Sequence, residues 1–234
     1  MESIFLIVIL IEYVLFVTTA APMFLVSRFN KAPTLGIWIW VGLFVSVIIA
    51  GFWSLALATW SVFETYIRLQ ANESLWFTLI ASITPWAMLG FAGVLMALAN
   101  QRLAPLFSQA RSADYLSLIA PREVFRFEKA RVFELDLPGY FAVTKKQGIY
   151  LSSAGFDLPE KQLQAVLRHE YGHIKLAHNN LKKISAFAVQ LMPWLAVSRA
   201  FNNELARLCE LSADRFALKK VDSADLQAAR KLFV

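Results

Sequence analysis

The chain has 234 residues, of which 58% are hydrophobic, with a mean hydropathy of +0.52 and a net charge of +6. This composition excludes an ordinary soluble domain, so we expect a membrane protein. The single cysteine, Cys209, excludes an intrachain disulfide and is expected in the core. Basic chains can bind nucleic acid, but the sequence has no dense Lys/Arg run and no recognisable nucleic-acid module, so no nucleic-acid partner is expected.

Three long apolar runs lie in the first part of the chain. Residues 4–26, 35–63 and 75–100 each exceed the roughly 20 residues that a spanning helix requires. The second and third runs contain no charged residue. The first contains Glu12, which is either a functional intramembrane carboxylate or a group near the interface, and no role is assigned to it. We therefore predict a membrane α-helical domain with three transmembrane spans over residues 1–101.

Basic residues next to these runs predict the orientation of the chain. Arg28 and Lys31 flank the first loop, and Arg102 and Arg111 follow the third run. The positive-inside rule then places the N-terminus outside and everything after the third span in the cytoplasm, at the inner (plasma) membrane. Residues 101–234 carry 20 Lys and Arg against 13 Asp and Glu, which favours contact with the anionic inner leaflet of the lipid bilayer.

A change in the sequence pattern follows the apolar runs. Residues 102–120 predict a linker helix that leaves the membrane. Short alternating segments bounded by turn residues then predict a small antiparallel sheet, with strands over residues 124–127, 131–137, 140–144 and 149–152. Such a sheet offers an edge to which an extended peptide can add as a further strand, or it only covers the core of the helix that follows.

That helix contains the sequence Arg168-His169-Glu170-Tyr171-Gly172-His173. His169 and His173 are four residues apart, so both imidazoles project from one face, which is the spacing that a single zinc ion needs. Glu170 lies beside the pair and can act as general base, as in His-Glu-x-x-His hydrolases. Two such histidines also occur by chance on amphipathic helices. Against that reading, all three histidines of the chain, including His178, are expected in this helix.

A catalytic zinc needs a third protein ligand and one open position. Glu210 and Asp214 are four residues apart within a run free of proline and glycine, so they are expected on one face of a second helix. We predict that Glu210 is the third metal ligand and that Asp214 accepts the free N–H of a ligating histidine. Without the histidine motif, Glu210 and Asp214 would be interpreted as part of an ordinary solvated, charged helix face.

The two motifs together resemble the membrane gluzincin metallopeptidases. Residues 191–194, Leu-Met-Pro-Trp, followed by residues 204–214 are most similar to the BlaR/MecR type, whereas residues 164–173 are equally similar to the HtpX and CAAX-prenyl-protease type. The resemblance covers about residues 139–220. It implies a small α+β zincin-like metallopeptidase domain, which we place at residues 121–234, and a sheet edge that presents the substrate to the metal.

One departure from the BlaR type concerns the end of the chain. Receptors of that type continue into a further span and an extracellular penicillin-binding sensor, whereas this chain stops about 20 residues after Asp214. A complete antibiotic receptor is therefore not expected, and the sensor domain is expected to be missing. A separate sensor or membrane partner subunit could supply that part.

The patterns predict a membrane-bound zinc metalloendopeptidase that cleaves a protein or peptide substrate, such as a repressor or a membrane protein, at the cytoplasmic membrane face. They do not separate regulatory from quality-control proteolysis. The alternative is a catalytically silent zinc-binding subunit that binds a partner, but such a subunit would be expected to have lost Glu170. The oxyanion donor stays open among Tyr171, His178, Arg215 and other residues, with His178 favoured as an ordinary polar residue near the helix end.

Residues 184–201 form an apolar stretch of about 18 residues, which is just long enough for a fourth span. A single crossing would place Glu210 on the opposite side of the membrane from His169 and His173, so one zinc ion would not reach all three. We therefore predict a helix, broken near Pro193, that packs within the zinc domain or lies in the inner interface.

Overall fold

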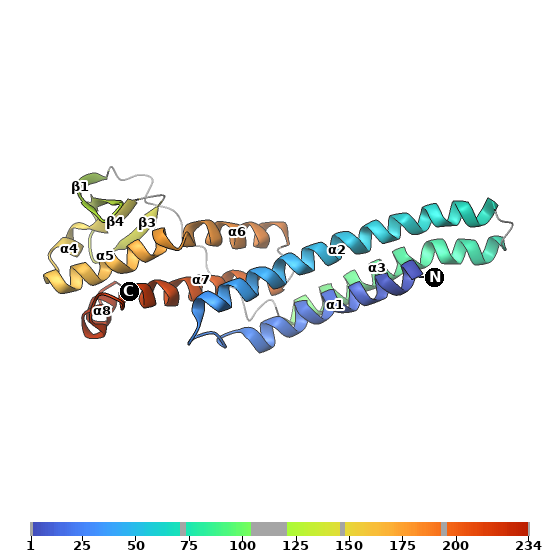
Figure 1. The fold of residues 1–234 in the computed structure, drawn as a ribbon, viewed down its shortest axis with the longest axis horizontal. Coiled ribbons are helices and arrows are strands. Elements are labelled where there is room, and N and C mark those ends of the chain that lie inside the picture. Colours follow the sequence, from blue (N-terminus) through green and yellow to red (C-terminus); the bar gives the residue numbers. More distant parts are fainter. Residues whose placement is uncertain (1, 71–73, 104–120, 146–147, 193–195, 234) are drawn as a thin grey trace. The chain divides into compact units, whose positions relative to one another are not determined.

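A computed structural model describes residues 2–70, 74–103, 121–145, 148–192 and 196–233. In this part of the chain there are eight helices and four strands (Figure 1). The chain divides into two compact units. The first contains residues 1–29, 38–108 and 188–204, and the second contains residues 30–37, 109–187 and 205–234.

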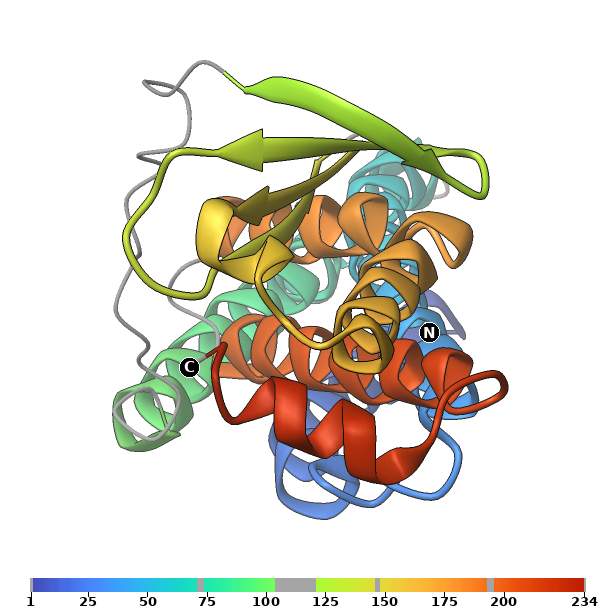
Figure 2. The ribbon, with the colours of Figure 1, turned by 90° about the vertical axis from the view of Figure 1, so that its left-hand side faces the viewer.

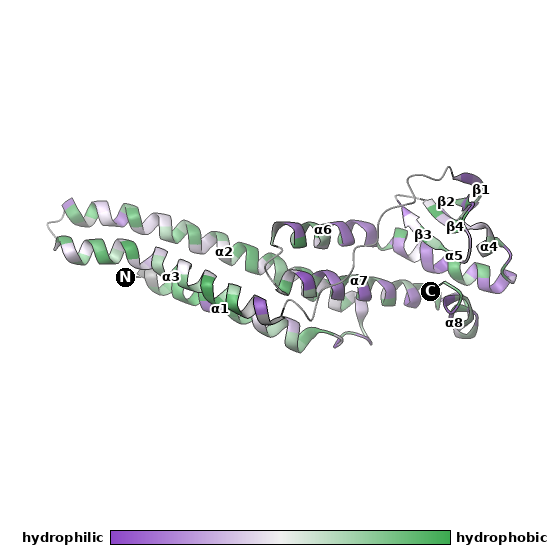
Figure 3. Cartoon of the chain, turned by 180° about the vertical axis from the view of Figure 1, so that it is seen from behind, coloured by the Kyte–Doolittle hydropathy of each residue, from purple (hydrophilic) through white to green (hydrophobic). Residues whose placement is uncertain are grey.

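The first unit is built mainly from three long helices, α1 (Glu2–Leu25), α2 (Pro33–Gln70) and α3 (Leu75–Leu103). They fall where the three spans are predicted, and α2 is longer than its predicted span. Large apolar side chains are exposed along all three, for example Phe16, Trp53 and Trp76. Figure 3 shows hydrophobic residues along the length of these helices. A helix that is apolar all round suits lipid better than water. By length and composition, each of the three is able to cross a membrane.

The boundaries of the predicted domains stay predictions. The linker helix expected over residues 102–120 lies almost entirely outside the described residues, since α3 ends at Leu103 and β1 begins at Arg122. Among the described residues, the candidate spans are confined to α1, α2 and α3. Residues 184–201, for which no crossing is predicted, are divided between α6 (His178–Leu191) and α7 (Ala196–Ala217), and Pro193 lies outside the described part.

The first turns of α7 belong to the apolar core of the first unit. Phe201 of α7 is 1% exposed and stacks on Phe44 of α2 with ring centroids 4.7 Å apart. One turn later, the Glu204 carboxylate accepts a hydrogen bond of 3.0 Å from the backbone N–H of Ser27. These contacts explain why this half of the apolar stretch forms a packed helix.

The second unit contains a four-stranded sheet with the strand order β1-β2-β4-β3. Its strands are β1 (Arg122–Phe127), β2 (Ala130–Leu135), β3 (Ala142–Lys145) and β4 (Gly148–Ser152). The prediction of a purely antiparallel sheet is wrong, because β2 and β4 pair in parallel. The chain after β2 first forms β3, and β4 then returns antiparallel to β3 and inserts beside β2. Local alternation predicts strands, but it does not predict which strands pair.

Helix α5 (Glu160–Lys175) lies between the sheet and α8 (Ser223–Arg230) (Figure 2). The short helix α4 (Ser153–Phe156) connects the sheet to this layer. The sheet, α5 and α8 share one core. It is built from their apolar side chains Val132, Ile149, Leu151, Val166, Leu167 and Ala229. Fully burying one side chain of this kind contributes roughly 1.5–3 kcal/mol, so this packing holds α5 firmly against the sheet.

The prediction that all three histidines share one helix is wrong. Helix α5 ends at Lys175, and His178 is the first residue of α6. Between the two helices Ala177 has a φ of 54°, in the left-handed region that costs a non-glycine residue roughly 1–2 kcal/mol. No glycine or proline marks this break in the sequence, which is why a single continuous helix was expected.

Candidate metal centre

Helices α5 and α7 approach each other closely next to the His-Glu-x-x-His motif. A Cβ atom placed on Gly172 would lie 3.2 Å from Cδ1 of Phe216 and 3.3 Å from Cα of Ala213. Glycine therefore allows an approach of the two backbones that any other residue would hinder. His173 follows Gly172 directly, and Asp214 follows Ala213, so the close approach brings the histidine motif of α5 to the carboxylates of α7.

Three of the predicted site residues form a compact group. Nε2 of His169 lies 3.2 Å from Nε2 of His173 and 3.2 Å from Oε2 of Glu210. The third side of the triangle, from His173 Nε2 to Glu210 Oε2, is 3.4 Å. His173 is buried, and the other two side chains are partly buried. The structure thus brings Glu210 to the two histidines, from which the sequence separates it by about 40 residues.

The size of this triangle fits a zinc ion. Tetrahedral zinc with bonds of about 2.1 Å holds its ligand atoms about 3.4 Å apart. Two imidazole nitrogens and one carboxylate oxygen are also the donor set of many catalytic zinc sites, which leave a fourth position open. The residues present therefore fit a single zinc ion in both spacing and chemistry.

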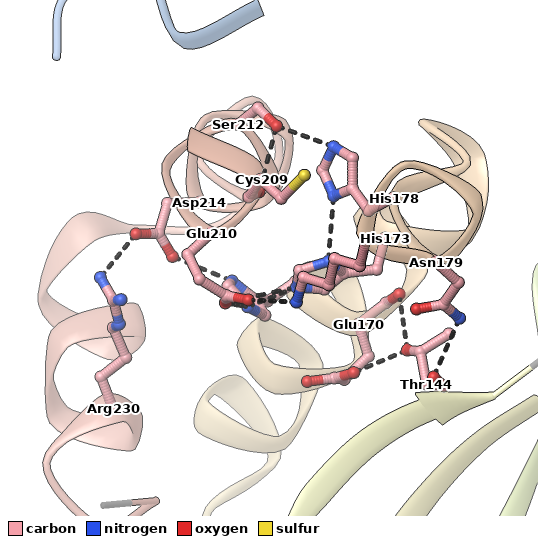
Figure 4. A network of polar contacts seen from close by, with 12 residues as sticks. Thr144, Glu170, His173, His178, Asn179, Cys209, Glu210, Ser212, Asp214 and Arg230 are labelled. Atoms are coloured by element: carbon pink, nitrogen blue, oxygen red, sulfur yellow. Dashed lines mark hydrogen bonds and ion pairs between the residues drawn. The ribbon is translucent and has the colours of Figure 1, made fainter. Parts of the chain in front are cut away.

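The predicted partner of the histidines, Asp214, contacts His169 on the side away from the triangle. Its Oδ1 lies 2.9 Å from Nδ1 of His169, and among the described residues neither atom has another hydrogen-bond partner. The other oxygen, Oδ2, accepts a hydrogen bond of 2.5 Å from Arg230 of α8 (Figure 4). Arg230 was not predicted, since only the folded chain brings α8 to this position.

The two carboxylates control the protonation of His169. Burial by itself acts to lower the pKa of His169, but the hydrogen bonds with Asp214 and Glu210 outweigh burial and raise the pKa to about 9. In the metal-free protein His169 is therefore protonated at neutral pH. Zinc binding must then displace a proton from it, because a metal ligand is the neutral imidazole.

Glu210 also has a second partner that the sequence did not reveal. Its Oε1 accepts a hydrogen bond of 2.8 Å from Nζ of Lys182 on α6. Burial acts to raise the pKa of Glu210, but His169, His173 and Lys182 outweigh it and hold the pKa well below its usual range. Glu210 therefore stays ionised, as a metal ligand must be.

Glu170, the predicted general base, lies on the sheet side of α5. Its side chain is 8% exposed, and its Oε2 accepts a hydrogen bond of 2.6 Å from the hydroxyl of Thr144 on β3. The backbone carbonyl of Thr144 accepts a hydrogen bond of 3.0 Å from Asn179 of α6 (Figure 4). The edge strand β3 thus contacts both Glu170 on α5 and Asn179 on α6. Neither Thr144 nor Asn179 was predicted as a site residue.

His178 was expected to be an ordinary polar residue, and the structure places it inside the site. It is 1% exposed, and its Nδ1 lies 2.9 Å from Nδ1 of His173. Burial is the largest cause that lowers the pKa of His178 to about 3, and the interactions with His173 and Lys182 act in the same direction, so its ring is neutral. Of the other two oxyanion candidates, Tyr171 packs in the core against Phe216, and Arg215 is exposed.

The spacing of the three ligand atoms, with a glutamate next to the first histidine, points to a metallopeptidase. Residues 135–233 match the model of Peptidase family M48. The matched segment runs from the end of β2 through α8 and contains the three residues of the candidate metal site, which we call the metal group: His169, His173 and Glu210. Over this segment the chain is similar to the M48 metallopeptidases, a family that generally uses zinc. No curated protein and no solved structure matches the chain.

The protonation of His169 predicts how the zinc affinity of this candidate site depends on pH. Below a pKa of about 9 each zinc ion must displace the His169 proton, so the apparent affinity should rise about tenfold per pH unit between pH 7 and 8. Competition titrations with a zinc-sensitive dye would measure this slope. Asp214→Asn, which removes one of the carboxylates that raise the pKa of His169, should give a shallower slope. An affinity that does not change over this range would contradict the protonation of His169.

Proposed function

We propose that the protein is a membrane-bound zinc metalloendopeptidase that cleaves protein substrates at the cytoplasmic face of the membrane. The observation that carries the proposal is the triangle of His169 Nε2, His173 Nε2 and Glu210 Oε2 beside Glu170. A zinc ion held there would supply Lewis-acid chemistry, lowering the pKa of water and polarising the scissile carbonyl. The M48 match and the three apolar helices support the peptidase and the membrane location, respectively.

In this proposal Glu170 performs the proton transfers. Its Oε2 is occupied by the Thr144 hydroxyl, which orients the carboxylate and leaves Oε1 to accept the proton of the attacking water. Glu170 then returns that proton to the leaving amine. The strand β3, which carries Thr144 at the edge of the sheet, is the edge where an extended substrate would add as a further strand.

The proposal predicts about one zinc ion per chain in protein purified without chelator. Elemental analysis by mass spectrometry would measure the zinc content, and an unfolded membrane-protein substrate would serve to measure hydrolysis. A chelator should abolish hydrolysis, and added zinc should restore it. Absence of zinc from well-folded protein, or full hydrolysis after complete removal of the metal, would contradict the proposal.

The proposed orientation predicts which positions a membrane-impermeant thiol reagent reaches. In a Cys209→Ser background, single cysteines would replace Lys31, Asn180 and Lys219, all exposed. Each should react from the cytoplasmic side of oriented vesicles. Ser74, just before α3, should instead react from the outside after replacement by cysteine. If the cysteines at positions 180 and 219 react from opposite sides, both this topology and Glu210 as a metal ligand are wrong.

A further inference from the structure

His178 is the one histidine that the proposed metal group does not use, and it is almost completely buried. Its Nδ1 lies 2.9 Å from Nδ1 of His173, the ring nitrogen opposite the proposed ligand atom. Its Nε2 lies 2.8 Å from the hydroxyl of Ser212 on α7. That hydroxyl in turn donates a hydrogen bond of 3.1 Å to the carbonyl oxygen of Cys209 (Figure 4).

The break between α5 and α6 is what allows the two histidines to meet. On one continuous helix, residues five apart point about 140° away from each other, so His173 and His178 would not touch. The left-handed Ala177 turns the chain and begins α6 with His178 facing back toward His173. Lys182 lies one turn further along α6 and bonds Glu210, so this face of α6 contacts two of the three proposed ligands.

If His173 binds zinc, the donors and acceptors in the series of hydrogen bonds from His173 through His178 to Ser212 can be assigned in only one way. With Nε2 on the metal, His173 carries its proton on Nδ1 and can only donate there. Nδ1 of His178 must then accept, so neutral His178 carries its proton on Nε2 and donates it to Ser212 Oγ. The Ser212 hydroxyl keeps its own proton for the carbonyl of Cys209. Every donor in this series of hydrogen bonds then has one acceptor.

We propose that His178 is a positioning residue for the metal ligand His173. Its Nδ1 accepts the hydrogen bond that fixes the tautomer and the ring orientation of His173, and Ser212 fixes the tautomer of His178 in turn. His178 thus does for His173 what Asp214 does for His169, with a neutral partner in place of a carboxylate. The proposal rests on the proposed zinc site, and it concerns metal affinity directly and catalysis only through it.

Metal affinity tests the proposal without any substrate. Zinc and cobalt(II) would be titrated into the full-length, metal-free protein in detergent, with the cobalt absorption bands as the readout of ligand geometry. His178→Leu should weaken binding about 10–100-fold, as loss of an outer partner usually does. His178→Asn should recover most of the affinity, since the Asn Oδ1 occupies about the same place as the histidine Nδ1 and can accept the same hydrogen bond. Ser212→Ala should give a smaller loss.

Ser152→Ala is the matched control, because Ser152 also carries a buried hydroxyl in this unit, and among the contacts described that hydroxyl bonds only the backbone N–H of Phe141. It should leave zinc affinity unchanged even if it lowers stability. Equal affinity in wild type and His178→Leu, or an equal loss in the Leu and Asn variants, would overturn the proposal. A wild-type protein that binds no zinc would instead overturn the proposed function.

The tautomer of His178 provides a second test, which is read from the wild-type protein. Because the chain has three histidines, protein labelled with ¹⁵N-histidine gives signals from only three rings. In the zinc-bound protein, Nδ1 of His178 should be unprotonated and Nε2 protonated, with the signals assigned by their loss in His178→Asn. The opposite tautomer, which a merely structural histidine could adopt equally well, would overturn the proposal.

Discussion

Glu170→Gln is expected to lower the rate of peptide hydrolysis by about 10²–10⁴-fold while the protein keeps one zinc ion per chain. The substitution removes the proton acceptor and leaves His169, His173 and Glu210 in place. Gln can still accept the 2.6 Å hydrogen bond from the Thr144 hydroxyl, so the fold around β3 should not change. Cleavage rates of a protein substrate and zinc analysis of the same preparation would measure both effects.

The matched control for this experiment is Glu160→Gln. Glu160 lies in the first turn of the same helix and is exposed, so its replacement removes the same charge from α5 at a distance from the metal group. It should leave hydrolysis within about twofold of the wild-type rate, as surface substitutions usually do. A normal rate in the Glu170 variant would mean that another group accepts the proton.

The inactive Glu170→Gln variant also allows the substrates to be identified. Comparing the cleaved protein ends in cells that carry the wild-type protein or Glu170→Gln would identify the substrates of the proposed peptidase. One dominant cleaved protein, such as a repressor, would indicate regulatory proteolysis. Many damaged membrane proteins would indicate quality control. A comparison without any difference would favour a zinc-binding subunit that acts as a partner.

Glu210→Gln is expected to weaken zinc binding by more than the about 10–100-fold that loss of an outer partner costs. The carboxylate oxygen that completes the triangle becomes part of a neutral amide, which is a poorer ligand. Lys182 loses its ionic partner at the same time, since Oε1 of Glu210 is 2.8 Å from its Nζ. Zinc competition titrations would measure the loss, and Asp214→Asn, which removes an outer partner only, should lose less.

Glu204→Gln provides the control for the removal of a buried carboxylate from the same helix. Glu204 is 3% exposed on α7 and accepts a hydrogen bond from the backbone of Ser27. Its replacement should not change zinc affinity, even if the stability of the protein falls. Equal zinc affinity in wild type and Glu210→Gln would assign the third ligand to another residue.

The sequence by itself was sufficient for the features that depend on local spacing. Four-residue intervals place His169 with His173, and Glu210 with Asp214, on single helix faces, because the helical repeat is set by the backbone. Long apolar runs predicted α1, α2 and α3 for a similarly local reason, since length and composition decide whether a helix suits a membrane. The four strands were also predicted, within a few residues of their observed ends.

Only the tertiary structure decided which of these faces meet and what surrounds them. The close approach at Gly172 and Ala213 joins two helices that no local pattern relates. Lys182 and Arg230 reach the site from separate helices, and His178 does so only because the chain turns at Ala177. The parallel pairing of β2 and β4 was mispredicted for the same reason. Such contacts depend on packing between distant segments, whereas a sequence pattern records only the preference of each segment for its own local structure.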